Sequence, residues 1–155
     1  MLNRTYDTQV CSIARTLEVV GERWTLLVLR DVLRGVRRFE ELVQSLGVAR
    51  NVLSDRLDRL VDHGLLERQP YQDRPPRFEY QPTAKGSELL VVLMGLMHWG
   101  DRHLAGDDGP PRIAEHRHCG GAVVEQLLCA ACGQPLTPDQ VVTRPGPGLR
   151  SRAAG

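Results

Sequence analysis

The sequence predicts a mainly α-helical fold with a small β-hairpin, which is an α+β class, followed by a small C-terminal extension. Apolar residues recur at helical spacing over most of the first hundred residues, two short strand-like stretches flank a pair of prolines, and cysteine and histidine cluster near the C-terminus. A chain of 155 residues accommodates one domain of ordinary size and a small appendage. Its 41% hydrophobic and 25% charged residues are typical of a globular protein that folds.

The first helical pattern covers residues 12–34, and Gly21 is expected to split it into two helices. Gly35 then provides a stop, and a third helix over residues 39–46 is closed by Gly47. The apolar positions of the first pattern recur at spacings of three and four, which is typical of amphipathic helices: Ile13, Leu17, Val20, Trp24, Leu27, Val28 and Val32.

A fourth helix follows almost at once and ends at His63 and Gly64. One face is apolar, made of Val52, Leu53, Leu57, Leu60 and Val61. The opposite face is polar, made of Arg50, Asn51, Ser54, Asp55, Asp58 and Arg59. Two short helices joined by a tight turn with glycine are the outline of a helix-turn-helix.

The stretches 65–71 and 77–81 are predicted to be strands of a hairpin whose tip is residues 72–76. Pro75 and Pro76 cannot lie within a central strand, so they mark the tip of this wing. Thr83 then fits an N-cap for a helix that reaches about His103. The apolar surface of that helix is wider than one small domain needs, so we expect part of it to pack against a second subunit: Leu89, Leu90, Val92, Leu93, Leu96, Met97 and Trp99.

The expected domain organisation has four parts. A winged helix-turn-helix with a C-terminal dimerisation helix occupies residues 1–106, a linker rich in Gly, Asp and Pro covers 107–112, and a Cys/His extension resembling a zinc ribbon covers 113–143. Residues 144–155 offer little to bury, and we expect a disordered tail.

The net charge of +1 usually argues against a dedicated nucleic-acid binder. The distribution of arginine is more informative than the sum, although the near absence of lysine also reflects codon usage in a GC-rich genome. Nine arginines fall in one central stretch: Arg34, Arg37, Arg38, Arg50, Arg56, Arg59, Arg68, Arg74 and Arg77.

Six ordered segments carry a resemblance to a known family, over residues 11 to about 104: 11–15, 21–30, 37–42, 49–57, 75–80 and 83–86, read as CSIAR, GERWTLLVLR, RRFEEL, ARNVLSDRL, PPRFEY and TAKG. The chain resembles the HxlR family of bacterial winged-helix regulators, relatives of the MarR group. The resemblance implies a homodimer that binds duplex DNA at a palindromic operator, often near a divergently transcribed gene. The cysteine-rich extension resembles one found only in some members.

The fourth helix is expected to enter the major groove. Arg50 can engage guanine, Asn51 adenine, and Ser54 either a base or a phosphate. Arg59, on the same face, is also expected to contact DNA. Asp55 and Asp58 would repel phosphates, so we expect them to pair with neighbours such as Arg59. A plain solvated helix face is the alternative interpretation.

Four further arginines are expected to position the protein on the DNA backbone without specifying sequence. Arg74 and Arg77 flank the wing tip, where a guanidinium can enter a narrow minor groove or hold a phosphate. Arg37 and Arg38 open the third helix, where a helix crossing the backbone contacts phosphate. Ordinary surface arginines are the alternative for all four.

Near the C-terminus, His116 and Cys119 form one pair at chelating separation, and Cys129 and Cys132 form another. One nitrogen and three thiolates suit tetrahedral Zn²⁺, and four filled positions would make the metal structural rather than hydrolytic. His118 can replace His116 as a ligand. A metal-free hairpin with free or buried thiols is the alternative.

Cys11 lies where some HxlR relatives carry a redox-sensing cysteine. Sensing needs an exposed thiolate of low pKa, and Arg15 one turn away can lower that pKa. The alternative is a small core residue on the apolar side of a helix.

The leading hypothesis is therefore a homodimeric regulator of transcription that responds to a small ligand or to oxidation. A protein-interaction adaptor that uses the wing and zinc extension is the alternative. An enzyme is disfavoured because the sequence has no nucleophile elbow, phosphate-binding loop or carboxylate pair. No apolar run approaches a membrane span and the N-terminus lacks a secretory signal, so a cytoplasmic location is expected.

Overall fold

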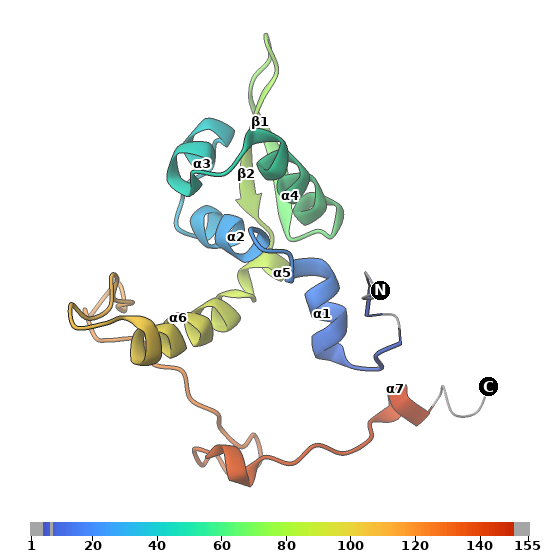
Figure 1. Ribbon diagram of the computed structural model, residues 1–155, viewed down its shortest axis with the longest axis vertical. Coiled ribbons are helices and arrows are strands. Elements are labelled where there is room, and N and C mark those ends of the chain that lie inside the picture. Colours follow the sequence, from blue (N-terminus) through green and yellow to red (C-terminus); the bar gives the residue numbers. More distant parts are fainter. Residues whose placement is uncertain (1–4, 7, 151–155) are drawn as a thin grey trace. The chain divides into compact units, whose positions relative to one another are not determined.

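A computed structural model describes residues 5, 6 and 8–150 (Figure 1). The elements are α1 Ser12–Val20, α2 Thr25–Leu33, α3 Phe39–Leu46, α4 Arg50–Asp62, β1 Leu66–Gln72, β2 Arg77–Pro82, α5 Ala84–Ser87, α6 Leu90–Leu104, the 3₁₀ turn η1 Pro138–Gln140, and α7 Pro147–Arg150. The chain divides into two compact units between Leu96 and Met97, a point inside α6.

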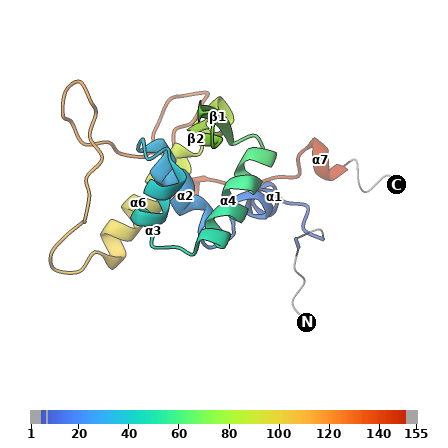
Figure 2. The same ribbon diagram turned by 90° about the horizontal axis from the view of Figure 1, so that it is seen from above.

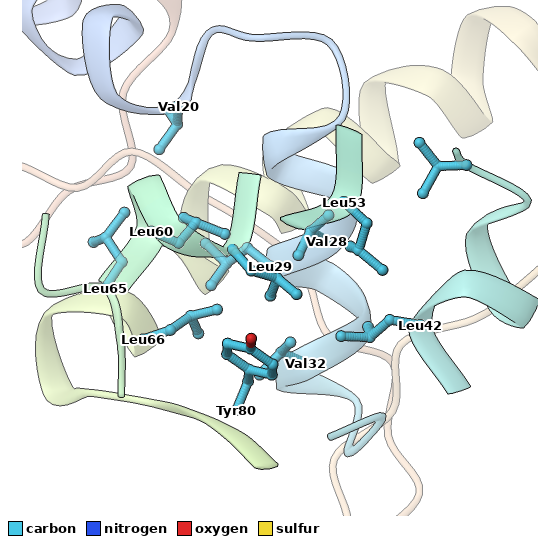
Figure 3. Packing of buried hydrophobic residues seen from close by; sticks show 12 residues of the cluster. Val20, Val28, Leu29, Val32, Leu42, Leu53, Leu60, Leu65, Leu66 and Tyr80 are labelled. Carbon is cyan, nitrogen blue, oxygen red and sulfur yellow. The ribbon is translucent and has the colours of Figure 1, made fainter. Parts of the chain in front are cut away.

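The first unit is built around α2, which contacts α3, α4 and β2 (Figures 1 and 2). Val28, Leu29 and Val32 of α2 have no exposed surface, and they meet buried leucines from α3, α4 and the start of β1 (Figure 3). Burying one such side chain contributes about 1.5–3 kcal/mol relative to leaving it exposed. Val28 and Val32 belong to the predicted apolar pattern and Leu29 does not, whereas Ile13 and Leu17 of that pattern are exposed.

The hairpin is antiparallel, with its register running from Leu66 opposite Pro82 to Gln72 opposite Arg77. An irregularity between Pro70 and Gln72 leaves Tyr71 unpaired in the register. The tip lies beyond α3 and α4 in Figure 1. The wing predicted from the two prolines is therefore present, and the fold is a winged helix-turn-helix of the α+β class.

The helix predicted from Thr83 to His103 is broken, contrary to the sequence expectation. It forms α5 and α6, with a turn at Glu88 and Leu89 between them. Thr83 is the N-cap of α5 as predicted, since its hydroxyl oxygen accepts a hydrogen bond from the Gly86 amide at 3.1 Å. Before the break, α5 is held close against the start of the hairpin, since a Cβ on Gly86 would lie 2.0 Å from the Leu65 carbonyl oxygen.

The second unit has little regular structure of its own beyond the end of α6. Single β-bridges join Glu115 to Ala122 and Leu128 to Pro135, and none of the described residues after α6 is buried. The helix α7 lies inside the stretch predicted to be a disordered tail, and residues 151–155 fall outside the described residues. The domain limits at 106, 112 and 143 stay predictions. In the part of the chain that the structure describes, no helix has the length and apolar character to span a membrane.

Candidate nucleic-acid interface

The helix α4 is divided into a buried face and an exposed face. Leu53, Leu57 and Leu60 are at most 1% exposed and lie in the core, whereas Asn51 and Ser54 are exposed. Three leucines at helical spacing fix the rotation of α4 about its axis. The residues that the sequence assigns to base contacts are thereby presented to solvent together.

The turn before α4 sets where that exposed face begins. Gly47 ends α3 with a φ of 61°, and the next residue, Val48, is only 6% exposed. Ala49 is extended and precedes the first turn of α4. The short, anchored connection holds the N-terminus of α4 beside α3, which is the arrangement of a helix-turn-helix.

Arg50, the first residue of α4, is held by a carboxylate that the sequence pattern did not reveal. Its two terminal nitrogens donate to Glu40 of α3 at 2.7 and 2.6 Å, and its guanidinium lies 5.0 Å from the centre of the Phe39 ring. The hydrogen bond from Arg50 lowers the pKa of Glu40, and the positive charges of Arg50 and Arg77 lower it further. Arg50 is therefore paired within the protein, not presented alone to a base.

Other predicted contact residues have no such tether. Among the described residues, Arg37, Asn51, Ser54 and Arg74 make no side-chain hydrogen bond or ion pair. Arg74 and Arg77 are exposed at the wing tip, at either end of the turn. These side chains are accessible for contact with a phosphate or a base edge.

Arg38 joins the start of α3 to the wing. Its guanidinium donates to Glu79 of β2 at 3.0 Å and lies 4.5 Å from the centre of the Tyr71 ring. The hydrogen bond to Glu79 raises the pKa of Arg38. In addition, the Tyr80 amide donates to the Arg37 carbonyl at 2.9 Å. The two predicted backbone-contact regions are thus one connected surface.

The polar pairs on α4 differ from the prediction. Arg59 is half-buried and donates to the Glu18 carbonyl of α1 at 3.2 Å, so it links two helices instead of facing outward. Asp58 pairs with Arg68 of β1, and Asp55 lies 3.4 Å from Arg56. The acidic residues are neutralised, but by partners that lie in the fold and not by Arg59.

Asp31 is a buried charge that sequence reasoning missed. Its side chain has no exposed surface, yet it accepts hydrogen bonds from the Ser45 hydroxyl at 2.6 Å and from Arg30 Nε at 2.8 Å. Burial alone would raise the pKa of Asp31, but these hydrogen bonds and the charges of Arg30 and Arg34 lower it overall. This network joins α2 to α3, and an acidic residue within an apolar helix was the signal for it.

Cys11 is exposed, contrary to the alternative that made it a core residue. It is the N-cap residue of α1. The amides of Ala14 and Ile13 lower the pKa of its thiol, in place of the Arg15 side chain expected from the sequence to do so. The thiol is accessible, which is the first requirement for reaction with an oxidant.

The predicted metal ligands form two separate pairs. His116 Nδ1 lies 3.0 Å from Cys119 Sγ, which favours His116 over His118 as its partner. The amides of Cys132 and Ala131 lower the pKa of the Cys129 thiol. Across the described residues, no three His, Cys, Asp or Glu side chains lie together as the ligands of one metal would.

The family described as HxlR-like helix-turn-helix matches residues 19–108. An uncharacterized HTH-type transcriptional regulator of Mycobacterium tuberculosis is 45% identical over 143 residues, which is 92% of this chain and 90% of the relative. A regulator of Synechocystis with the same description is 36% identical over 59% of this chain and 68% of its own length.

Solved structures agree with this pattern. PA1374 of Pseudomonas aeruginosa, described as a candidate transcription factor, is 44% identical, with a TM-score of 0.66, over 92% of this chain and 99% of that one. PA1607, with a similar description, is 32% identical, with a TM-score of 0.80, over 89% of this chain and 96% of that one. The redox regulator HypR in its reduced form is 26% identical, with a TM-score of 0.56, over 59% of this chain and 92% of that one.

Proposed function

The chain belongs to the HxlR-like helix-turn-helix family of transcription regulators, and from this premise we propose that it reads a specific duplex DNA site with the N-terminal half of α4. The wing and the start of α3 contact the backbone on either side. The chain acts as a homodimer, so its operator is palindromic.

One observation carries the proposal: Asn51 and Ser54 are exposed and unpaired among the described residues, on a helix that three fully packed leucines hold in place. A base-reading helix needs a rigid inner face and free polar groups outside. Arg74 and Arg37 add untethered positive charge at the wing and before α3, where phosphate contact requires it.

The test is selection of bound fragments from the genome by the purified full-length protein, followed by titration of the recovered site. A single enriched palindrome, bound far more tightly than unrelated DNA of equal length, is the expected result. Uniform, sequence-independent binding would contradict base readout and would favour the adaptor interpretation.

Variants separate base readout from backbone contact. Asn51→Ala should cost about 1–3 kcal/mol of discrimination at one base pair, with other positions unchanged. Arg74→Ala should weaken binding to every sequence and reduce the salt slope by about one. Gln126→Ala and Arg144→Ala are matched controls, because both residues are exposed in the second unit and should leave binding unchanged.

The homodimer is supported by apolar side chains left exposed in a single chain. On α6, Val91 is 73%, Leu96 54% and Trp99 53% exposed, and on α1 Ile13 is 71% exposed. Large apolar surfaces of this kind mark an interface. We propose that a second copy of the chain covers this surface, because a two-fold symmetric operator requires two copies.

Sedimentation equilibrium of the wild type should give twice the mass of the chain. Leu96→Glu should shift the protein toward monomer. It should also weaken operator binding, because a monomer contacts only one half-site of the palindrome. Gln126→Glu introduces the same charge at an exposed polar position and should stay dimeric. A monomeric wild type that binds a palindrome with full affinity would contradict the dimer.

A signal is proposed to act through Cys11 or a small ligand. The exposed Cys11 thiolate attacks a peroxide oxygen, which forms a sulfenic acid and releases water or hydroxide. Dimedone trapping after mild peroxide, followed by operator titration, tests the redox route. We expect dimedone to label the wild type but not Cys11→Ser. We also expect the oxidised wild type to bind the operator more weakly. An unlabelled wild type with unchanged affinity would leave the small ligand as the effector.

A further inference from the structure

The second unit contains two turns with one and the same backbone design. Each spans four residues between ligand-type side chains and is followed by glycine: His116 to Cys119 before Gly120, and Cys129 to Cys132 before Gly133. Both turns open a short hairpin arm closed by a β-bridge.

The hydrogen bonds of the two turns match position by position. The Gly120 amide donates to the His116 carbonyl at 2.8 Å, and the Gly133 amide donates to the Cys129 carbonyl at 2.8 Å. The His116 amide donates to the Gly121 carbonyl at 2.8 Å, and the Cys129 amide donates to that of Gln134 at 3.0 Å. Sequences with little else in common thus fold into the same turn twice.

The first turn brings its two side chains together. His116 Nδ1 is 3.0 Å from Cys119 Sγ, whereas two tetrahedral Zn²⁺ ligands at about 2.0 and 2.3 Å from the metal lie about 3.5 Å apart. A small increase in the distance between Nδ1 and Sγ therefore lets both atoms bind one ion.

Glycine is required in both turns for steric reasons. The φ angles of Gly120 and Gly133 are +69° and +71°, a region that residues with a side chain rarely adopt. A Cβ on Gly121 would lie 3.4 Å from Cys119 Sγ, so glycine there also leaves room for the sulfur. The glycines therefore permit the turn conformation, and Gly121 leaves space beside the Cys119 sulfur.

The segment holding these turns lacks a core of its own. None of the described residues after α6 is buried, and Val124, Leu127 and Leu128 are each more than half exposed. Segments of this kind gain folding free energy from a metal, whose ligands are gathered only when it binds. In the described residues the two pairs are separate, as expected for such a segment before a metal binds.

We propose that the two turns close on one Zn²⁺ with His116, Cys119, Cys129 and Cys132 as its ligands. One imidazole nitrogen and three thiolates fill a tetrahedral shell, so the ion is structural and has no open position for a substrate. Residues 123–127, between the two β-bridges, would have to bend to bring the pairs together.

The test is the metal content of the full-length protein, purified without chelator under reducing conditions and measured by elemental analysis. About one zinc per chain is expected. Replacement by Co²⁺ should give the intense visible absorption of a tetrahedral thiolate site. Zinc below about a tenth of the chain concentration, or a Cys129–Cys132 disulfide in the reduced preparation, would overturn the site.

Variants test whether both pairs hold the same ion. Cys119→Ser and Cys129→Ser should each lower zinc affinity in a chelator competition by more than about 100-fold. His116→Asn should do the same, while the matched His118→Asn and Cys11→Ser should keep wild-type affinity. Full affinity in either Cys119→Ser or Cys129→Ser would show that the pairs do not share a metal and would overturn the proposal.

Discussion

Glu40 holds the guanidinium of Arg50, a residue that the proposed complex would place against DNA. The carboxylate receives both terminal nitrogens of the guanidinium, a bidentate geometry that a guanine edge or a phosphate would also use. Both side chains are mostly exposed, so the pair contributes little to stability. In the proposed complex its main effect is on DNA affinity, because Arg50 either leaves Glu40 or brings that negative charge to the DNA.

Neutralising this carboxylate should strengthen DNA binding. Glu40→Gln removes one negative charge and releases Arg50, so we expect operator affinity to rise about 3- to 10-fold at moderate salt. Fluorescence anisotropy titration over a salt series measures it, with Glu88→Gln as a control at an exposed site in another element. A fall in affinity would mean that Glu40 orders Arg50 for binding instead of competing for it.

Asp31 stabilises the fold while it is ionised. Asp31→Asn should lower the free energy of unfolding at pH 7 by about 1–3 kcal/mol, because the charge-assisted hydrogen bonds to Arg30 and Ser45 are lost. Urea unfolding of both proteins measures the difference.

The pH dependence of that difference has a defined sign. The pKa of Asp31 is lower in the native state, so its stabilisation is complete above the unfolded value of about 3.9 and declines as pH falls through the native value. The gap between wild type and Asp31→Asn should therefore narrow below about pH 4. A gap that widens with acid would contradict the assignment.

At the scale of elements, α5 and the hairpin are joined by close backbone contact. Thr83 Oγ1 lies 2.7 Å from the Gly64 carbonyl oxygen, which it can donate to, and accepts from the Gly86 amide. Lys85 Nζ donates to the His63 carbonyl at 2.7 Å. The end of α4 and the start of α5 are thereby fixed to one another.

Gly86→Ala should disrupt this junction. The added Cβ would lie 2.0 Å from a backbone oxygen that cannot move aside cheaply, so a loss of more than about 2 kcal/mol is expected in chemical unfolding. Gly95→Ala is the matched control, since a Cβ there would meet nothing within 4 Å and α6 gains a better helix former. Equal stability of the two variants would contradict the close approach.

At the scale of the whole molecule, the two units should respond differently to loss of metal. Among the described residues, the hydrophobic core contains no buried residue after Tyr80, so we expect its stability to be independent of residues 113–143. If zinc holds the extension, a chelator should increase amide hydrogen exchange there and leave α2 and α4 protected. Loss of protection in α2 on chelation would contradict this independence.

The fold was predictable because its signals are local. Apolar spacing identified the buried leucines of α4, and Pro75 and Pro76 marked the wing tip. Partners of charged side chains were not predictable, because Arg50 meets Glu40, and Arg59 meets Glu18, only after helices pack. The close approach of Gly86 to Leu65 was not predictable for the same reason, since it joins segments that meet only in the folded chain.

The hydrogen bond from Tyr80 to Arg37, with the bridge of Arg38 to Glu79, makes the residues before α3 a one-rung third strand beside β2. Sideways displacement of the hairpin therefore carries Arg37 and Arg38 with it. In the proposed complex, a groove width that deflects the wing tip would therefore also move Arg37 and Arg38 relative to the phosphates, which couples DNA shape to backbone contact.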